Sequence, residues 1–220
     1  GRTAIVTGAN SGIGLETTVA LAAVGARVIM ACRNLAKASA ALESVRRRAP
    51  QADVSLMTLD LASLASVRAF AAEFRREHSR LDLLINNAGI LGVPLTLTVD
   101  GFESQMAANY FGHFALTGLM IEPLMTTPGA RVITVGSHGH WFGRVNPDDL
   151  NYEHTPYTPG SGYCNSKLAN LLFVLELTRR LASKDSQVVA AAAHPGGADT
   201  NIKPKPDKRT LGTRLHDALV

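Results

Sequence analysis

The sequence predicts an α/β protein built on one doubly wound parallel sheet, a Rossmann fold in a single domain. Short β-branched runs alternate with helical stretches along most of the chain. Several of the strand-like runs are almost continuously apolar, as in strands that are buried on both faces. A glycine-rich turn joins the first strand to the first helix. Right-handed crossovers between parallel strands would place helices on both faces of the sheet.

Four strands and three helices are expected in the first half of the chain. The strands are short runs of apolar and β-branched residues, and the helices carry alanine or other apolar residues at helical spacing. Gly25 ends the first helix. In chain order the elements are strand 3–6, helix 15–24, strand 27–31, helix 35–48, strand 54–59, helix 63–78 and strand 82–86.

Two strands and two long helices are expected in the second half. In order they are helix 102–125, strand 130–135, helix 161–183 and strand 187–192. The connection 139–162 contains several glycines and the prolines Pro147, Pro156 and Pro159, which preclude much regular structure. A connection of this length inside a compact domain is usually functional.

The composition is that of an ordinary globular protein. The 220 residues are 46% hydrophobic and 18% charged, and the net charge of +4 is scattered, so no nucleic-acid partner is expected. The two cysteines are too few for a disulfide framework, and no His/Cys group has zinc spacing. No apolar run is long enough to span a bilayer, and the chain opens on its first predicted strand. We therefore expect a soluble, cytoplasmic protein without a metal.

The glycine turn from Thr7 to Gly14, with the sequence TGANSGIG, is predicted to hold the phosphates of a dinucleotide. Three glycines suit a turn that needs positive φ, a close approach of ligand to backbone, and tight packing of helix on strand. The N–H groups and the dipole of the helix start would face a phosphate. The alternative is an ordinary glycine-rich connection, because the G-x-x-x-G-x-G spacing departs from the usual fingerprint.

Small, glycine-rich or polar residues follow all six predicted strands. In a doubly wound sheet, ligands bind outside these carboxyl ends, so the residues predict the lining of a site for a long, flat cofactor. They are Gly8 to Gly14, Cys32-Arg33, Asp60-Leu61, Asn87-Ala88-Gly89, Ser137-His138 and His194-Pro195-Gly196.

The end of the second strand predicts a preference for NADP over NAD. A site that selects the free ribose usually places Asp or Glu there, whereas this chain has Cys32. The adjacent Arg33, assisted by Asn34 and Lys37, can pair with a 2′-phosphate. Alternatively, Arg33 stacks on adenine or faces solvent. Ser11 in the glycine turn leaves NAD open, because a basic residue there would favour the phosphate more strongly.

Tyr163 and Lys167 form the candidate catalytic pair, because they lie four residues apart at the start of a predicted helix and project from one face. The ammonium favours phenolate over phenol, so the tyrosine can exchange a proton with a substrate. Ser137 can hydrogen-bond the same substrate oxygen, and the amide of Asn109 can hold a water near Lys167. Each residue alone has an ordinary structural explanation, so the prediction rests on their joint occurrence with the glycine turn.

The sequence resembles the classical short-chain dehydrogenases/reductases over nearly the whole chain up to Thr200. Within that family it is most similar to the retinol dehydrogenase and WW-domain oxidoreductase branch, in the segments 136–138, 148–151 and 163–170. The matching family motifs are Thr7-Gly8-x-x-x-Gly12-x-Gly14, Asn86-Asn87-Ala88-Gly89, Asn109, Ser137, Tyr163-x-x-x-Lys167 and Pro195-Gly196-x-x-x-Thr200.

The resemblance implies hydride transfer between a nicotinamide cofactor and a carbonyl or alcohol carbon. It makes Tyr163 the general acid/base, Lys167 the residue that supports it and holds the nicotinamide ribose, Ser137 the residue that orients substrate, and Asn109 the anchor of a relay water. The remaining implied contacts are all with cofactor: Gly8, Asn10, Ser11, Gly12, Ile13 and Gly14 at the pyrophosphate, Asp60 and Leu61 at the adenine, Asn87, Ala88 and Gly89 near the ribose, and Pro195, Gly196 and Thr200 at the carboxamide or pyrophosphate.

The chain departs from the family pattern after Thr200. Family members continue through a substrate-covering helical segment into a seventh strand, whereas only residues 201–220 follow here. We therefore expect a cofactor-binding and catalytic domain at 1–200 and a basic tail at 201–220 that begins the lid. The last strand and most of the lid are expected to be missing or truncated.

Three functions compete at this stage. The favoured one is a nicotinamide-dependent oxidoreductase acting on a hydrophobic alcohol, aldehyde or ketone. The others are a non-catalytic dinucleotide sensor or partner-binding protein, which would typically lack the tyrosine or lysine, and a sugar-nucleotide epimerase or dehydratase, which can share Y-x-x-x-K.

A homodimer is also predicted. The helix 161–183 carries apolar residues around more than one stripe, including Leu168, Leu172 and Leu175. Burial under the neighbouring long helix is the competing explanation for this apolar surface.

Overall fold

In the computed structural model, which describes residues 1–196, six parallel strands form one sheet. The strand order is β3-β2-β1-β4-β5-β6, with the order reversing beside β1, as in a doubly wound Rossmann fold. This confirms the predicted fold class. The strands are β1 (Thr3–Thr7), β2 (Arg27–Cys32), β3 (Val54–Thr58), β4 (Leu83–Asn86), β5 (Arg131–Val135) and β6 (Val189–Ala193).

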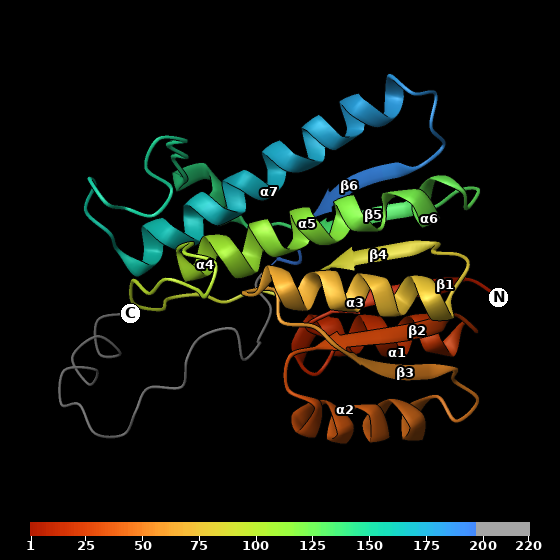
Figure 1. The fold of residues 1–220 in the computed structure, drawn as a ribbon. Helices are drawn as coiled ribbons and strands as arrows, with labels where there is room; N and C mark the ends of the chain where they lie inside the picture. The colour runs from red at the N-terminus through yellow and green to blue at the C-terminus, as the bar shows by residue number, and fades with distance from the viewer. Residues whose placement is uncertain (197–220) are drawn as a thin grey trace.

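Helices cover both faces of the sheet (Figure 1). One face is covered by α1 (Gly12–Ala23) and α2 (Leu35–Arg48), and the other by α3 (Leu64–Glu77), α5 (Gly112–Leu119) and α7 (Pro159–Ala182). None of the helices described within residues 1–196 is both long enough and apolar enough to cross a bilayer.

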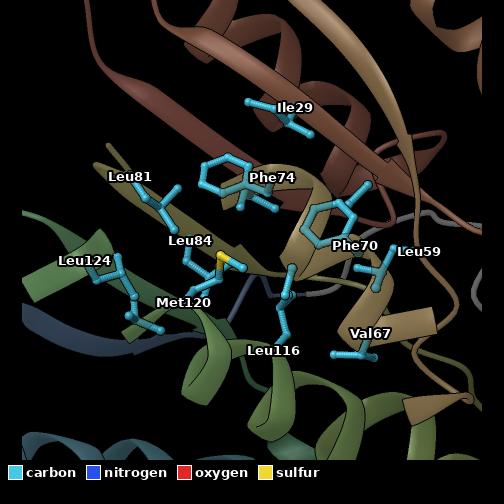
Figure 2. Packing of buried hydrophobic residues seen from close by; sticks show 14 of the residues in the cluster. Ile29, Leu59, Val67, Phe70, Phe74, Leu81, Leu84, Leu116, Met120 and Leu124 are labelled. Carbon is cyan, nitrogen blue, oxygen red and sulfur yellow. The ribbon is translucent and has the colours of Figure 1, made fainter. Parts of the chain in front are cut away.

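Large side chains fill the core between the sheet and α3, α5 and α7. Figure 2 shows Phe70 and Phe74 of α3 beside Leu84 of β4 and Leu116 of α5, all of them almost fully buried. Burial of each such side chain contributes about 1.5–3 kcal/mol relative to exposure. This core fixes α5 and α7 against the sheet, and α7 carries the candidate catalytic residues Tyr163 and Lys167.

Small side chains fill the core on the opposite face. Ala22 of α1 and Ala38 and Ala41 of α2 pack over Val28 and Met30 of β2. Alanine lets a helix approach the strands closely, which explains the alanine-rich sequence of α2. The first helix begins at Gly12, three residues earlier than expected, so its N-terminus lies within the glycine turn.

The expectation of a single helix at 102–125 is wrong in detail. The segment consists of α4 (Ser104–Met106), the π-helical turn η1 (Ala107–Phe111), α5, and α6 (Ile121–Met125) after a break at Met120. Pro123 accounts for the break, because it has no N–H to donate to the carbonyl of Leu119 and its ring crowds that group. Glu103 sets the first boundary, since its carboxylate accepts hydrogen bonds from the backbone N–H groups of Gln105 and Met106.

The long connection before α7 contains more regular structure than expected. The 3₁₀ helix η2 (His138–Phe142) opens it, capped by the Ser137 side chain, which accepts from the Gly139 N–H. The last helix begins at Pro159 rather than at residue 161. Thr158 and Ser161 form a capping box there, and proline is tolerated at the first helical position because its missing N–H would have no partner.

Candidate active site

A cleft of about 350 Å³ opens at the carboxyl ends of the strands. It extends from the glycine turn after β1 to the first turns of α7, so the two predicted parts of the site share one cavity. Eighteen of the predicted site residues line it: Gly8, Asn10, Ser11, Gly12, Ile13, Gly14, Arg33, Asp60, Leu61, Asn87, Ala88, Gly89, Ser137, Tyr163, Lys167, His194, Pro195 and Gly196.

Three residues with predicted catalytic or cofactor-binding roles are not part of this lining, and neither are Ala9, Cys32 and His138, which were predicted from the strand ends. Asn34 caps α2 instead, because its side-chain oxygen accepts from the Lys37 N–H at 3.0 Å. Asn109 is fully buried behind the cleft wall. Thr200 and the predicted basic tail 201–220 lie outside the described residues.

The structure adds residues that were not predicted to be in the site. Each one directly adjoins a predicted strand end or catalytic position, so sequence adjacency was the available signal, but nothing in their chemistry marks them. They are Ala31, Leu59, Ile90, Ala108, Val135 and Gly136.

Each glycine of the turn meets a geometric requirement, positive φ at two positions and close packing at the third. Gly8 and Gly12 have φ values of 64° and 53°, which side chains rarely tolerate. A Cβ on Gly14 would overlap the carbonyl oxygen of Gly8 and lie 2.5 Å from Asn87 Nδ2. The predicted reasons for three glycines, positive φ and close packing, are therefore present in the structure.

The N-terminus of α1 is suited to an anion. Among the described residues, the Ser11 side chain makes no capping hydrogen bond, and the first turn contains no acidic residue. The backbone of Gly12, Ile13 and Gly14 lines the cleft, so the helix presents its N-terminal dipole to that space.

The end of β2 combines a neutral side chain with a cation. Cys32 is buried, and this burial raises the pKa of its thiol to about 11, so it stays uncharged. Arg33 is exposed at the cleft and has no carboxylate within 4.0 Å in residues 1–196. Arg33 therefore places a positive charge at this end of the cleft.

Lys167 is buried beside Tyr163 in the first half of α7. Its Nζ donates to the backbone carbonyl of Val135 at 3.0 Å and lies 5.7 Å from the centre of the Tyr163 ring. Burial lowers the pKa of this amine to about 8, because the charged form is poorly solvated there. The lysine therefore remains mostly protonated at pH 7.

Ser137 and Tyr163 meet across Gly139. A Cβ on Gly139 would lie 3.4 Å from Ser137 Oγ and 3.3 Å from Tyr163 Cε1. The Ser137 hydroxyl oxygen accepts from the Gly139 N–H at 3.1 Å, which fixes the side chain. The pair thus converges on one end of the cleft, although the two residues lie on different elements.

The amide of Asn109 is held on all sides. Its Nδ2 donates to the carbonyl of Ile90 at 3.0 Å and to Ser166 Oγ at 2.9 Å, while its Oδ1 accepts from the Ile90 N–H at 2.8 Å. Both amide hydrogens are thus used inside the protein, and any water held by this amide would have to donate to its oxygen. That oxygen and Lys167 Nζ both face Gly89, at 3.3 and 3.7 Å from a Cβ placed there.

A buried polar cluster fixes the start of α7, next to Tyr163. Gln105 Nε2 donates to Tyr157 Oη at 2.8 Å and to the carbonyl of Pro159 at 2.9 Å. Burial raises the pKa of Tyr157 to about 12, so its hydroxyl stays protonated and donates to the carbonyl of Val93. Gly162 packs against this cluster so closely that a Cβ would lie 2.7 Å from Gln105 Nε2.

Comparisons with known proteins agree on one family. Residues 2–210 match the family model described as short chain dehydrogenase. The chain is 45% identical over 202 residues to retinol dehydrogenase 13 of Homo sapiens and 44% identical over 215 residues to retinol dehydrogenase 14 of Homo sapiens. Each match covers 92% of this chain and 60% or 63% of the relative. The chain therefore spans about 60% of the length of these relatives.

Solved structures show the same fold. The crystal structure of an uncharacterized protein from Mycobacterium paratuberculosis matches with a TM-score of 0.80 at 50% identity, over 89% of this chain and 68% of that one. The Pseudomonas aeruginosa RhlG/NADP active-site complex matches with a TM-score of 0.73 at 25% identity, over 92% of this chain and 75% of that one.

Proposed function

The chain belongs to the short-chain dehydrogenase family, and from this premise we propose that it is an NAD(P)-dependent oxidoreductase acting on an alcohol or carbonyl group. The observation that carries the proposal is the continuity of one cleft between the glycine turn and the Tyr163–Lys167 pair. A dinucleotide is long enough to need both ends of such a cleft. When bound, its nicotinamide ring supplies or accepts the hydride.

The residues present fit a dinucleotide. Gly8, Gly12 and Gly14 leave three positions of the turn without a side chain, and the start of α1 offers uncapped N–H groups to a pyrophosphate. Asp60, Leu61 and Asn87 line the cleft, and we assign the first two to the adenine and Asn87 to the adjoining ribose.

Tyr163 acts as the general acid in the reduction direction and gives its proton to the carbonyl oxygen of the substrate. Ser137 can donate to the same oxygen, because its own oxygen already accepts from Gly139 and its hydrogen remains to donate. Lys167, mostly protonated at pH 7, stabilises the phenolate that remains. In the oxidation direction the same groups remove the proton from the alcohol.

Asn109 supports the relay that returns a proton to the pair. Its buried oxygen faces Gly89 on the same side as Lys167 Nζ. A water molecule that donates to this oxygen would connect the Lys167 ammonium to solvent. Thr200, implied as a further cofactor contact, lies outside the described residues.

NADP is the proposed cofactor, with NAD as the alternative. Replacing Arg33 with alanine is expected to lower kcat/KM for NADP by about 10- to 100-fold, because a charge-assisted pair with the 2′-phosphate contributes ~1.5–3 kcal/mol. Cys32→Asp combined with Arg33→Ala should also improve the use of NAD relative to NADP. The measurement is kcat/KM with each cofactor.

Arg47→Ala is the matched control for this prediction, because it removes the same charge from the opposite end of α2. It should leave both efficiencies within twofold of the parent. Equal efficiencies with NADP and NAD in the parent would contradict the preference.

The proposed substrate is a hydrophobic alcohol, aldehyde or ketone, in keeping with the similarity to retinol dehydrogenases. A panel of such compounds, including retinoids and steroids, should be assayed by absorbance of the reduced nicotinamide. An oxidoreductase changes that absorbance in proportion to product. A dinucleotide sensor would bind without turnover, and an epimerase or dehydratase would form product without net change in cofactor.

A homodimer through α5 and α7 is the proposed assembly. Phe114, Leu172 and Leu175 are apolar and remain 49–67% exposed on these two helices. Light scattering should give a dimeric mass for the parent and a lower mass for Leu175→Glu. Val24→Glu on the opposite face should not change the parent mass, and a monomeric parent at high concentration would refute the proposal.

A reducing, cytoplasmic compartment stays a prediction, based on the two free cysteines.

A further inference from the structure

His113 is a buried polar residue of α5 for which the proposed reaction has no use. The residue is 1% exposed and lies between two parts of the site. Nδ1 is 3.0 Å from the carbonyl oxygen of Asn109, and Nε2 is 2.8 Å from Thr7 Oγ1. An apolar side chain would fill this place in the core without needing either partner.

The partners determine the position of the ring hydrogen. A carbonyl oxygen only accepts, so Nδ1 must donate to Asn109. Thr7 Oγ1 accepts from the backbone N–H groups of Asn87 and Ala88, both at 2.9 Å, which uses its two lone pairs. Its hydrogen therefore donates to Nε2 at 2.8 Å, which is closer than the other available acceptor, the carbonyl of Ile85 at 3.3 Å.

Every group in this series of hydrogen bonds has its partner only when the imidazole ring is neutral. Burial and the nearby positive charge of Lys167 lower the pKa of His113 to about 4. The ring is therefore uncharged at pH 7, with its hydrogen on Nδ1, as the partners require. The chain of hydrogen bonds has a single direction and no unpaired member.

This series of hydrogen bonds joins two parts of the site, one in the cleft wall and one behind it. At one end, Thr7 holds Asn87 and Ala88, which line the cleft at the proposed ribose site. At the other end, the π-helical turn carries Asn109, whose amide donates to Ser166 beside Lys167. The imidazole of His113, on α5, connects these two segments through Thr7 and Asn109.

We propose that His113 is a positioning residue that holds the Asn87-Ala88 segment and the π-helical turn with Asn109 in one fixed relation. The proposal rests on the proposed function, because it assigns cofactor placement to one end and the proton relay to the other. His113 touches neither cofactor nor substrate. It acts through Thr7 and through Asn109.

Two conservative variants separate the two ends of the link. In His113→Asn, the shorter amide can still donate to the Asn109 carbonyl but does not reach Thr7. In His113→Gln, the longer side chain can still accept from Thr7 but leaves the Asn109 carbonyl without its partner. His113→Phe keeps the ring shape and loses both bonds.

The expected results differ between the variants. His113→Asn should raise the Kd of the reduced cofactor about 5- to 10-fold, with kcat within twofold of the parent. His113→Gln should lower kcat about 5- to 10-fold, with Kd within twofold of the parent. His113→Phe should show both changes. Cofactor fluorescence gives Kd, and a substrate from the panel gives kcat.

Amide hydrogen exchange provides a readout without cofactor or turnover. The Asn87 and Ala88 amides should exchange faster in His113→Asn and His113→Phe than in the parent and His113→Gln. Equal exchange in all four proteins, or a lower melting temperature with Kd and kcat unchanged in every variant, would overturn the proposal. A parent that turned over no substrate would refute the proposed function instead, and the exchange pattern would still decide the role of His113.

Discussion

Tyr163→Phe is expected to lower kcat by ~10²- to 10⁴-fold while leaving the cofactor Kd within twofold of the parent. The substitution removes one hydroxyl and almost no volume, so the cleft keeps its shape. Lys167 and Ser137 remain in place, but no group at this position can give a proton to the substrate oxygen. Steady-state kinetics and a fluorescence titration of the reduced cofactor measure the two quantities.

Tyr110→Phe is the matched control for this variant. Tyr110 also lies near the site, on η1, and its hydroxyl makes no hydrogen bond with residues 1–196. Its removal should leave kcat within twofold of the parent. If Tyr163→Phe retained most of the parent activity, Tyr163 would not be the general acid/base.

Gly14→Ala is expected to raise the Kd for the dinucleotide about 100-fold. The new Cβ would overlap the carbonyl oxygen of Gly8 and approach Asn87 Nδ2 to 2.5 Å. Overpacking of this kind costs ~1–3 kcal/mol. Relief requires movement of the backbone of the turn that holds the phosphates, so the loss falls on cofactor binding.

Gly118→Ala serves as the control, because the same methyl group on α5 would meet nothing within 4 Å. Alanine in an open helical position should stabilise the protein by ~0.5–1 kcal/mol through lower backbone entropy of the unfolded chain. Parent-like dinucleotide affinity in Gly14→Ala would contradict the proposed role of the turn. A circular dichroism spectrum separates weak binding from failure to fold.

Local sequence was sufficient for the sheet and for most of the cleft. Buried strands give apolar runs such as Ile5-Val6, and alternation with helices determines that the strands are parallel. Once the strand ends are known, the topology brings them to one edge, so Gly8, Asn87 and Ser137 could be placed together without knowing any contact.

Contacts between distant residues explain what could not be predicted. Asn34 is the exception, because its partner, the Lys37 N–H, is only three residues away and asparagine directly before a helix is a common N-cap. The π-helical turn at Asn109 depends on tertiary contacts with Ile90 and Ser166, which no helical pattern reveals. His113 reads as one more residue of an apolar helix until its two partners are seen.

Deuterium transfer tests the central claim of hydride exchange most directly. The protein is incubated with an accepted aldehyde or ketone and reduced cofactor that carries deuterium at the transferable position of the nicotinamide. The proposed function predicts one deuterium on the former carbonyl carbon of the alcohol product, in proportion to the cofactor oxidised. Product that contains no deuterium, or labelled cofactor that stays reduced while product forms, would contradict it.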